Sequence, residues 1–150
     1  MPHTYTRLTT HCVFGTHERM PPIDDAHRER LYGYMASVVN GKYGFSRQVG
    51  GTADHVHMLI DLRPDVALSD CMRDVKCLST RFARHGVLGL KHFGWQEGYG
   101  GFSVSASIVA TVTDYIRSQA GHHKARTFED EFRALLDKHG IEYDERFFWK

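Results

Sequence analysis

Residues 44–62, GFSRQVGGTADHVHMLIDL, decide the fold, because they contain two neighbouring candidate strands. The expected strands are 44–49 and 53–62, and Gly50-Gly51 between them predicts a hairpin-like turn. Pro64 then ends the second strand, since proline has no backbone N–H to donate to a sheet. An antiparallel pair of strands is therefore expected here.

Further segments on both sides of this pair complete a recognisable order. Residues 5–14 alternate in polarity, which predicts a strand with one buried face. Apolar side chains with helical spacing predict one helix that begins at Asp24 or Asp25 and ends at Asn40-Gly41, and another at 67–85. A short extended piece is expected at 102–104, followed by helices at 105–120 and 127–140.

This order predicts a ferredoxin-like (RRM-like) α+β fold. The expected architecture is an antiparallel sheet with helices on one face, plus a C-terminal helix that carries a tyrosine and one further helix. The chain has 150 residues and no repeats or linker-like stretches, so residues 1–150 are assigned to a single domain.

Composition sets broad limits on the class of protein. No apolar run has membrane-spanning length and the start does not resemble a signal peptide, so we expect a cytoplasmic protein without a membrane partner. Cys12, Cys71 and Cys77 are odd in number and have no paired spacing, which indicates reduced, mostly buried thiols. The net charge of +1 does not by itself indicate a nucleic-acid-binding protein.

The motif His55-Val56-His57 is the most informative chemical feature. In a strand, residues two apart project to the same face, so the two imidazoles lie side by side and can bind one divalent cation. A half-exposed strand that merely contains two histidines is an equally good interpretation of these residues alone. Two ligands also need a third from elsewhere in the chain.

The helix expected at 105–120 offers a nucleophile and a further ligand. Tyr115 and Gln119 lie one turn apart on the same helix face. A tyrosine hydroxyl can attack a phosphodiester, and the amide oxygen of Gln119 can join two histidines around a metal ion. From spacing alone, the structural alternative for Tyr115 is favoured, namely a ring in the core with its hydroxyl at the rim.

Five segments together resemble one family of enzymes. They are 54–57 (DHVH), 95–105 (WQEGYGGFSVS), 115–123 (YIRSQAGHH), 128–131 (FEDE) and 140–146 (GIEYDER). In this order they resemble the single-tyrosine HUH transposases of small bacterial insertion sequences. That family includes relatives associated with repeated extragenic palindromes, and the resemblance spans nearly the whole chain.

The resemblance implies a metal-dependent enzyme that cleaves and rejoins single-stranded DNA at hairpin-marked element ends. It assigns His55, His57 and Gln119 as ligands of Mg²⁺ or Mn²⁺ and Tyr115 as the nucleophile that forms a 5′-phosphotyrosine. It also implies a homodimer, in which the tyrosine helix can complete the partner's active site, so that cleavage occurs in trans.

DNA contacts are expected on two groups of basic residues. The segment 16–19 (THER) lacks the lysine that family members often carry after the first strand. We therefore place backbone contacts on Arg73, Lys76 and Arg84, and on a second group comprising His122, His123 and Lys124. A solvated helix face explains the first group equally well. Trp95 and Tyr99 are candidates for base stacking or for packing in the core.

Three alternative functions remain open at this point. The first is a non-enzymatic module that binds single-stranded nucleic acid, although the RNA-recognition signature is missing from the sequence. The second is a metal-dependent phosphoesterase with water as its nucleophile. The third is a domesticated relative that processes chromosomal repeats.

Overall fold

The computed structural model describes residues 3–17, 23–86, 88–119 and 127–146. Its strands are β1 (Thr9–Gly15), β2 (Gly44–Gly51), β3 (His55–Leu62) and β4 (Gly100–Ser103). Its helices are α1 (Asp25–Lys42), α2 (Leu68–His85), the short 3₁₀ helix η1 (Ala106–Ile108), α3 (Val109–Arg117) and α5 (Phe128–Lys138). Within the described ranges, no helix is long and apolar enough to cross a membrane.

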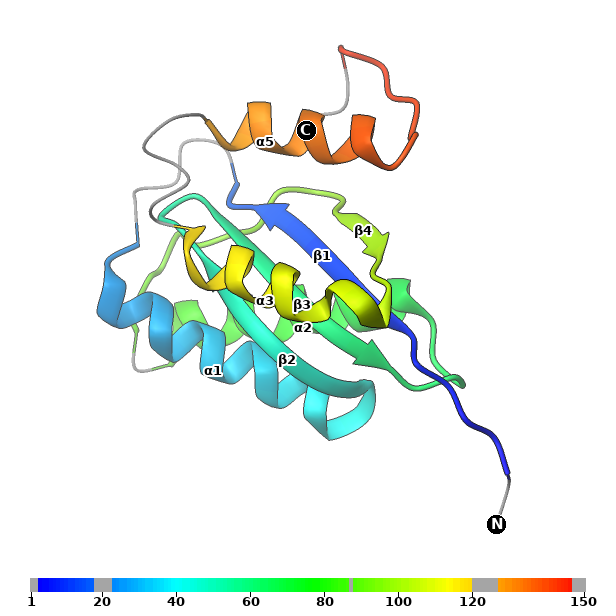
Figure 1. Cartoon of the computed structure of the whole chain (residues 1–150). Coiled ribbons are helices and arrows are strands. Elements are labelled where there is room, and N and C mark those ends of the chain that lie inside the picture. The colour runs from blue at the N-terminus through cyan, green and yellow to red at the C-terminus, as the bar shows by residue number, and fades with distance from the viewer. Residues whose placement is uncertain (1–2, 18–22, 87, 120–126, 147–150) are drawn as a thin grey trace.

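The four strands form one antiparallel sheet in the order β2-β3-β1-β4. This order follows from a β-α-β-β-α-β chain in which the hairpin partner β3 and the first strand β1 occupy the centre. The ferredoxin-like α+β fold predicted from the sequence is confirmed. In Figure 1, α3 lies in front of the strands and α2 behind them.

Helices α1 and α2 cover one face of the sheet and form the main core. The strands contribute their alternate apolar side chains, such as Cys12, Phe14 and Met58, and the helices contribute Leu31 and Val75. Helix α1 begins at Asp25 because the carboxylate of Asp24 accepts a hydrogen bond from the backbone N–H of His27. Cys12 and Cys71 are buried, Cys77 is exposed, and all three are free thiols, as predicted.

The opposite face of the sheet is covered by α3 and α5, and this corrects one prediction. Strand β1 was expected to have a single buried face, but its second face is buried too, because Val13 packs against Phe128, Phe132 and other side chains of α5. On the same face, Leu59 and Val104 pack against Ile116 of α3. The histidine pair therefore lies in an interior layer between the sheet and these two helices.

Several boundaries differ from the predicted ones. Strand β1 begins at Thr9 rather than residue 5, because its partner β3 ends at Leu62, whose backbone N–H donates to the carbonyl of Leu8. Gly50 and Gly51 still belong to β2, so the turn falls at 52–54. The expected helix at 105–120 begins as the 3₁₀ turn η1 and becomes α-helical at Val109.

Candidate metal centre and active site

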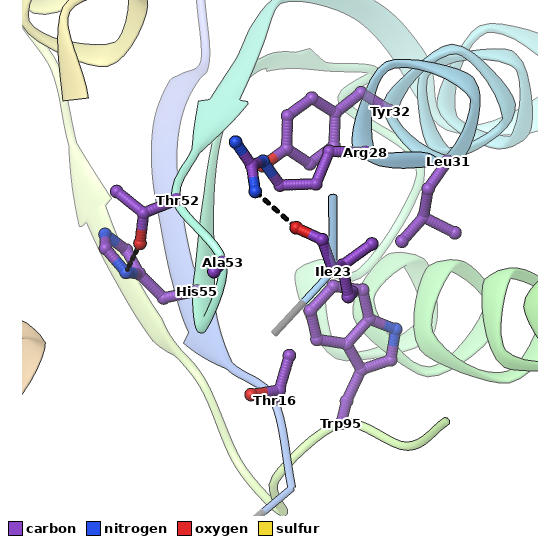
Figure 2. Close-up of a pocket in the computed structure, with 9 residues that line it drawn as sticks. All are labelled: Thr16, Ile23, Arg28, Leu31, Tyr32, Thr52, Ala53, His55 and Trp95. Carbon is purple, nitrogen blue, oxygen red and sulfur yellow. Dashed lines mark hydrogen bonds between the residues drawn. The ribbon is translucent and has the colours of Figure 1, made fainter. Parts of the chain in front are cut away.

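His55 and His57 of β3 project together toward α3 and α5, as the alternation of a strand requires. Both rings are buried, and each is held through its Nδ1 atom. His55 Nδ1 lies 2.8 Å from Asp54 Oδ1 and 3.0 Å from Thr52 Oγ1, and Figure 2 shows the contact with Thr52. His57 Nδ1 lies 2.8 Å from His11 Nε2. A histidine with Nδ1 protonated and bound in this way keeps the lone pair of Nε2 for a metal ion.

His11 of β1 is the residue that orients His57. Its ring stacks on that of His57, with centroids 5.0 Å apart. Burial, followed by the proximity of His57, lowers the pKa of His11 from 6.5 to about 3. The ring is therefore neutral at physiological pH, and its Nε2 can accept a hydrogen bond from His57 Nδ1–H.

Glu131 of α5 completes the cluster from the other side. Its Oε1 lies 2.7 Å from His57 Nε2 and 3.8 Å from His55 Nε2, and its side chain is fully buried. The position follows from the start of α5, where Thr127 caps the helix by accepting from the backbone N–H of Asp130. A carboxylate in such an interior is costly unless a positive charge faces it, which a bound cation supplies.

Gln119 also reaches this point. Its Oε1 lies 3.0 Å from His55 Nε2, and its Nε2 donates to the carbonyl of Tyr115 at 3.3 Å. The sequence-based assignment of Gln119 as a ligand is consistent with this distance but stays a prediction. Glu131, in contrast, lies in one of the family-like segments, but no ligand role was predicted for it from the sequence.

Tyr115 lies beside the cluster in the same chain. Its ring meets the ring of His57 edge to face at 5.7 Å and that of His11 at 6.3 Å. The side chain is half-buried and lines a cavity between α3 and α5. Tyr115 and a set of groups that could hold a metal ion are thus brought together by three elements that are far apart in the sequence.

The donor set fits a divalent cation. His55, His57 and Glu131 each offer one ligand atom, and these atoms all lie within 4.8 Å of one another. Two neutral imidazoles and one carboxylate suit first-row divalent metals such as Mn²⁺, and the Nδ1 contacts described above provide the outer hydrogen bonds that such ligands require.

Comparison with known proteins gives the family. The family model described as "Transposase IS200 like" matches residues 4–119, which is most of the chain. The chain belongs to the IS200-like transposase family. The match ends at Gln119, so Glu131 lies beyond it. The family resemblance predicted from the sequence is therefore confirmed, and the protein is a DNA-processing enzyme in class.

Two solved structures share the transposase fold. A candidate transposase from Deinococcus radiodurans R1 is 21% identical, with a TM-score of 0.61, over 79% of this chain and 95% of that one. A REP-associated tyrosine transposase bound to a REP hairpin is 17% identical, with a TM-score of 0.61, over 82% of this chain and 73% of that one. No functionally curated protein gave a significant match.

The first group of basic residues predicted to contact DNA lies on the other face of the sheet. Arg73, Lys76 and Arg84 belong to α2, which packs on the sheet face opposite the histidine pair. Arg73 is exposed and forms ion pairs with Asp70 and Asp74. The other two tie α2 to the loop before β4. DNA contact by this group stays a prediction, and His122, His123 and Lys124 lie outside the described residues.

Lys76 and Arg84 of α2 hold the loop before β4. Lys76 Nζ donates to the carbonyls of Gln96 and Gly98, and burial lowers its pKa to about 8. Arg84 Nε donates to the carbonyl of Phe93 at 2.6 Å. In the same region, Trp95 packs against Phe14 and Phe93, which favours its role in the core over base stacking.

Proposed function

We propose that this protein cleaves and rejoins single-stranded DNA in a metal-dependent reaction through a 5′-phosphotyrosine on Tyr115. The observation that carries the proposal is the edge-to-face contact between the Tyr115 ring and His57, a member of the buried His55, His57 and Glu131 cluster. Membership of a transposase family supports the choice of DNA as substrate.

The reaction conserves the phosphodiester bond energy. The Tyr115 hydroxyl oxygen attacks the scissile phosphorus and loses its proton, while the bond from phosphorus to the 3′-oxygen breaks and that oxygen gains a proton. A 3′-hydroxyl from another cleaved strand then attacks the phosphotyrosine and releases Tyr115. The balance requires no nucleotide cofactor.

His55, His57 and Glu131 would hold the divalent cation, and Gln119 is a candidate for a fourth ligand. A bound Mg²⁺ or Mn²⁺ ion supplies Lewis-acid withdrawal of charge from the scissile phosphate. His11, Asp54 and Thr52 keep the two imidazoles oriented through their Nδ1 atoms. The helices α3 and α5 cover the sheet face that carries the cluster.

We further propose that the substrate is a strand marked by a hairpin. A structurally similar REP-associated transposase was solved with a REP hairpin bound, and this supports hairpin DNA as the first substrate to test. The homodimer with exchanged tyrosine helices that the family resemblance implies stays a prediction. In the structure, Tyr115 lies beside His57 of its own chain.

The test is incubation with a labelled single strand carrying the element's own end hairpin, with Mn²⁺ or EDTA, followed by denaturing electrophoresis. We expect a metal-dependent covalent protein–DNA band that Tyr115→Phe abolishes. Tyr5→Phe is the matched control, because Tyr5 is 89% exposed and remote from the cluster. Cutting without a covalent band would favour a hydrolase that uses water, and binding without cutting would favour a binding module.

A separate measurement addresses the metal. Glu131→Gln keeps the shape of the side chain and removes its charge, so we expect Mn²⁺ affinity to fall by at least tenfold. Glu129→Gln, on the exposed side of the same helix turn, provides the control. Equal affinities in the two variants would contradict the assignment of Glu131 as a ligand.

A further inference from the structure

The cavity between α3 and α5 begins at the catalytic tyrosine and has no role in the function proposed so far. Its volume is about 270 Å³. Its floor is formed by His11 of β1 and by residues 102–104, its walls by α3 and α5, and Tyr115 and Glu131 lie at one end. The lining is mainly apolar, which is typical of a site for a small flat ligand fixed by a few polar groups.

The position of the cavity determines what can enter it. From Glu131 to Lys138, both of which line the cavity, α5 advances about 10 Å at 1.5 Å per residue. Successive nucleotides of a stacked strand are only about 3.4 Å apart, and more when the strand is extended. A strand whose phosphate lies against Tyr115 therefore has its adjacent nucleotide within reach of the cavity.

The lining chemistry fits a nucleobase. Tyr115 and His139 offer accessible aromatic rings, and His139 is backed by the buried ring of Phe102, with centroids 4.4 Å apart. Stacking on aromatic side chains is the usual means of holding unpaired bases without strict sequence preference. Lys138 at the far end adds a positive charge for a backbone phosphate.

We infer that this cavity binds the unpaired nucleobase directly next to the scissile phosphate. The inference rests on the proposed function, since it takes Tyr115 as the attacking residue. Occupation of the cavity fixes the strand on one side of the attacked phosphorus. It also makes duplex DNA a poor substrate, because a paired base cannot enter.

A pair of identical substitutions tests the cavity. Ala134→Leu places three additional carbon atoms in it, whereas Ala110→Leu adds the same atoms on the exposed side of α3, away from the lining residues. Thr111→Leu, at an exposed position on the opposite wall, provides a second filling variant. All are made in a Tyr115→Phe background, and binding of a fluorescent single-stranded oligo(dT) is measured by anisotropy with Mn²⁺ present.

We expect Ala134→Leu and Thr111→Leu to weaken oligonucleotide binding by about tenfold, the usual effect of losing one stacked base, and Ala110→Leu to leave it unchanged. Mn²⁺ affinity should stay at its original value in all three variants. Unchanged binding in both filling variants would overturn the inference. The sedimentation coefficient of each variant is measured as well. If the filling variants change the sedimentation coefficient and leave oligonucleotide binding unchanged, a second copy of the chain occupies the cavity and the inference is wrong.

Photocrosslinking locates the base directly. Oligo(dT) with a single 5-iododeoxyuridine should crosslink to the peptides that contain Phe102, Tyr115 or His139, and the duplex form should not. Crosslinks confined to α2 would refute the inference while leaving the phosphotyrosine proposal intact. Crosslinks in the cavity without any covalent cleavage product from the wild-type protein would refute the proposed function, and would leave only the binding of an unpaired base in the cavity.

Discussion

Gly50 of β2 lies against the backbone of the tyrosine helix α3. A Cβ added at Gly50 would lie 2.5 Å from the carbonyl oxygen of Ile116 and 3.0 Å from its Cγ2. Ordinary van der Waals contact begins at 3.4 Å, so Gly50→Ala requires a separation of about 0.9 Å. The obstacle is backbone, which cannot rotate away like the end of a side chain. The substitution therefore has to move α3.

The displacement has two expected consequences. Overpacking of this size costs about 1–3 kcal/mol of the free energy of unfolding. In a chain of this length the melting temperature falls by about 2–4 °C for each kcal/mol. Because Tyr115 moves with α3, we expect covalent complex formation to slow by up to about 100-fold, the effect of a misplacement of 1 Å. Mn²⁺ affinity should fall less than the rate, since His55, His57 and Glu131 are not on α3 and only the candidate ligand Gln119 follows this helix.

Gly33→Ala is the matched control. Gly33 lies in the middle of α1, and a Cβ there meets no atom within 4 Å. Alanine is the better helix former by about 0.5–1 kcal/mol, so this variant should be slightly more stable than the wild type and equally active. Thermal denaturation and the rate of appearance of the covalent band compare the two. A Gly50→Ala protein that melts and reacts like Gly33→Ala would refute the argument.

Three further predictions concern the metal site, a buried lysine and the pairing of subunits. His11→Leu removes the partner of His57 Nδ1 and should lower Mn²⁺ affinity, measured by titration calorimetry, by about 10–100-fold. His11→Gln retains an acceptor and should keep most of the affinity. Equal Mn²⁺ affinities of the two variants would show that His11 does not orient His57. Lys76, labelled at ¹³Cε, should titrate by NMR near pH 8 instead of 10.5. Between pH 8 and pH 10.5 the unfolded chain holds the proton of Lys76 and the folded chain does not, so the contribution of Lys76 to stability should rise with pH across this range. Titration of Lys76 together with the other lysines would contradict its burial. An equimolar mixture of Tyr115→Phe and His57→Ala proteins should form no covalent complex if Tyr115 acts within its own chain. If two subunits exchange tyrosine helices, about half of the dimers contain one subunit of each variant, and one of the two active sites in each of these is intact. About a quarter of all sites would then form the covalent complex.

The fold could be predicted because each element carries its own local signal. These signals act over a few residues: the alternating side chains of the strands, the capping carboxylate of Asp24, and Gly50-Gly51 before the turn. The order of strands and helices along the chain then leaves few possible topologies. The second buried face of β1 could not be predicted in this way. Val13 is apolar in any arrangement, but its burial depends on α5, which is more than a hundred residues later in the chain. Local patterns do not specify which helix covers which face.

In the candidate site, too, contacts within one element could be predicted and contacts between distant elements could not. His55 and His57 are two residues apart on one strand, so their shared direction follows from the geometry of the strand. Gln119 is one turn from Tyr115, so a common helix face was predictable, although its contact with His55 was not. Glu131 comes 74 residues after His57, which is about half the length of the chain. Only the packing of α5 on the sheet brings its carboxylate to the imidazoles.

The contacts of α3 explain how Tyr115 can reach the cluster within one chain. Ile116 packs on Leu59, and its backbone lies against Gly50, which together fix the position and rotation of the helix. Adjacent residues of a helix point about 100° apart, so Tyr115 packs at the side of this contact and its ring meets that of His57. A helix exchanged between two copies would make the same contacts with the partner's sheet, because the sheet surface is identical. The path of residues 104–108 is therefore the feature that distinguishes the two arrangements, and in the structure it leads from β4 back onto the same sheet.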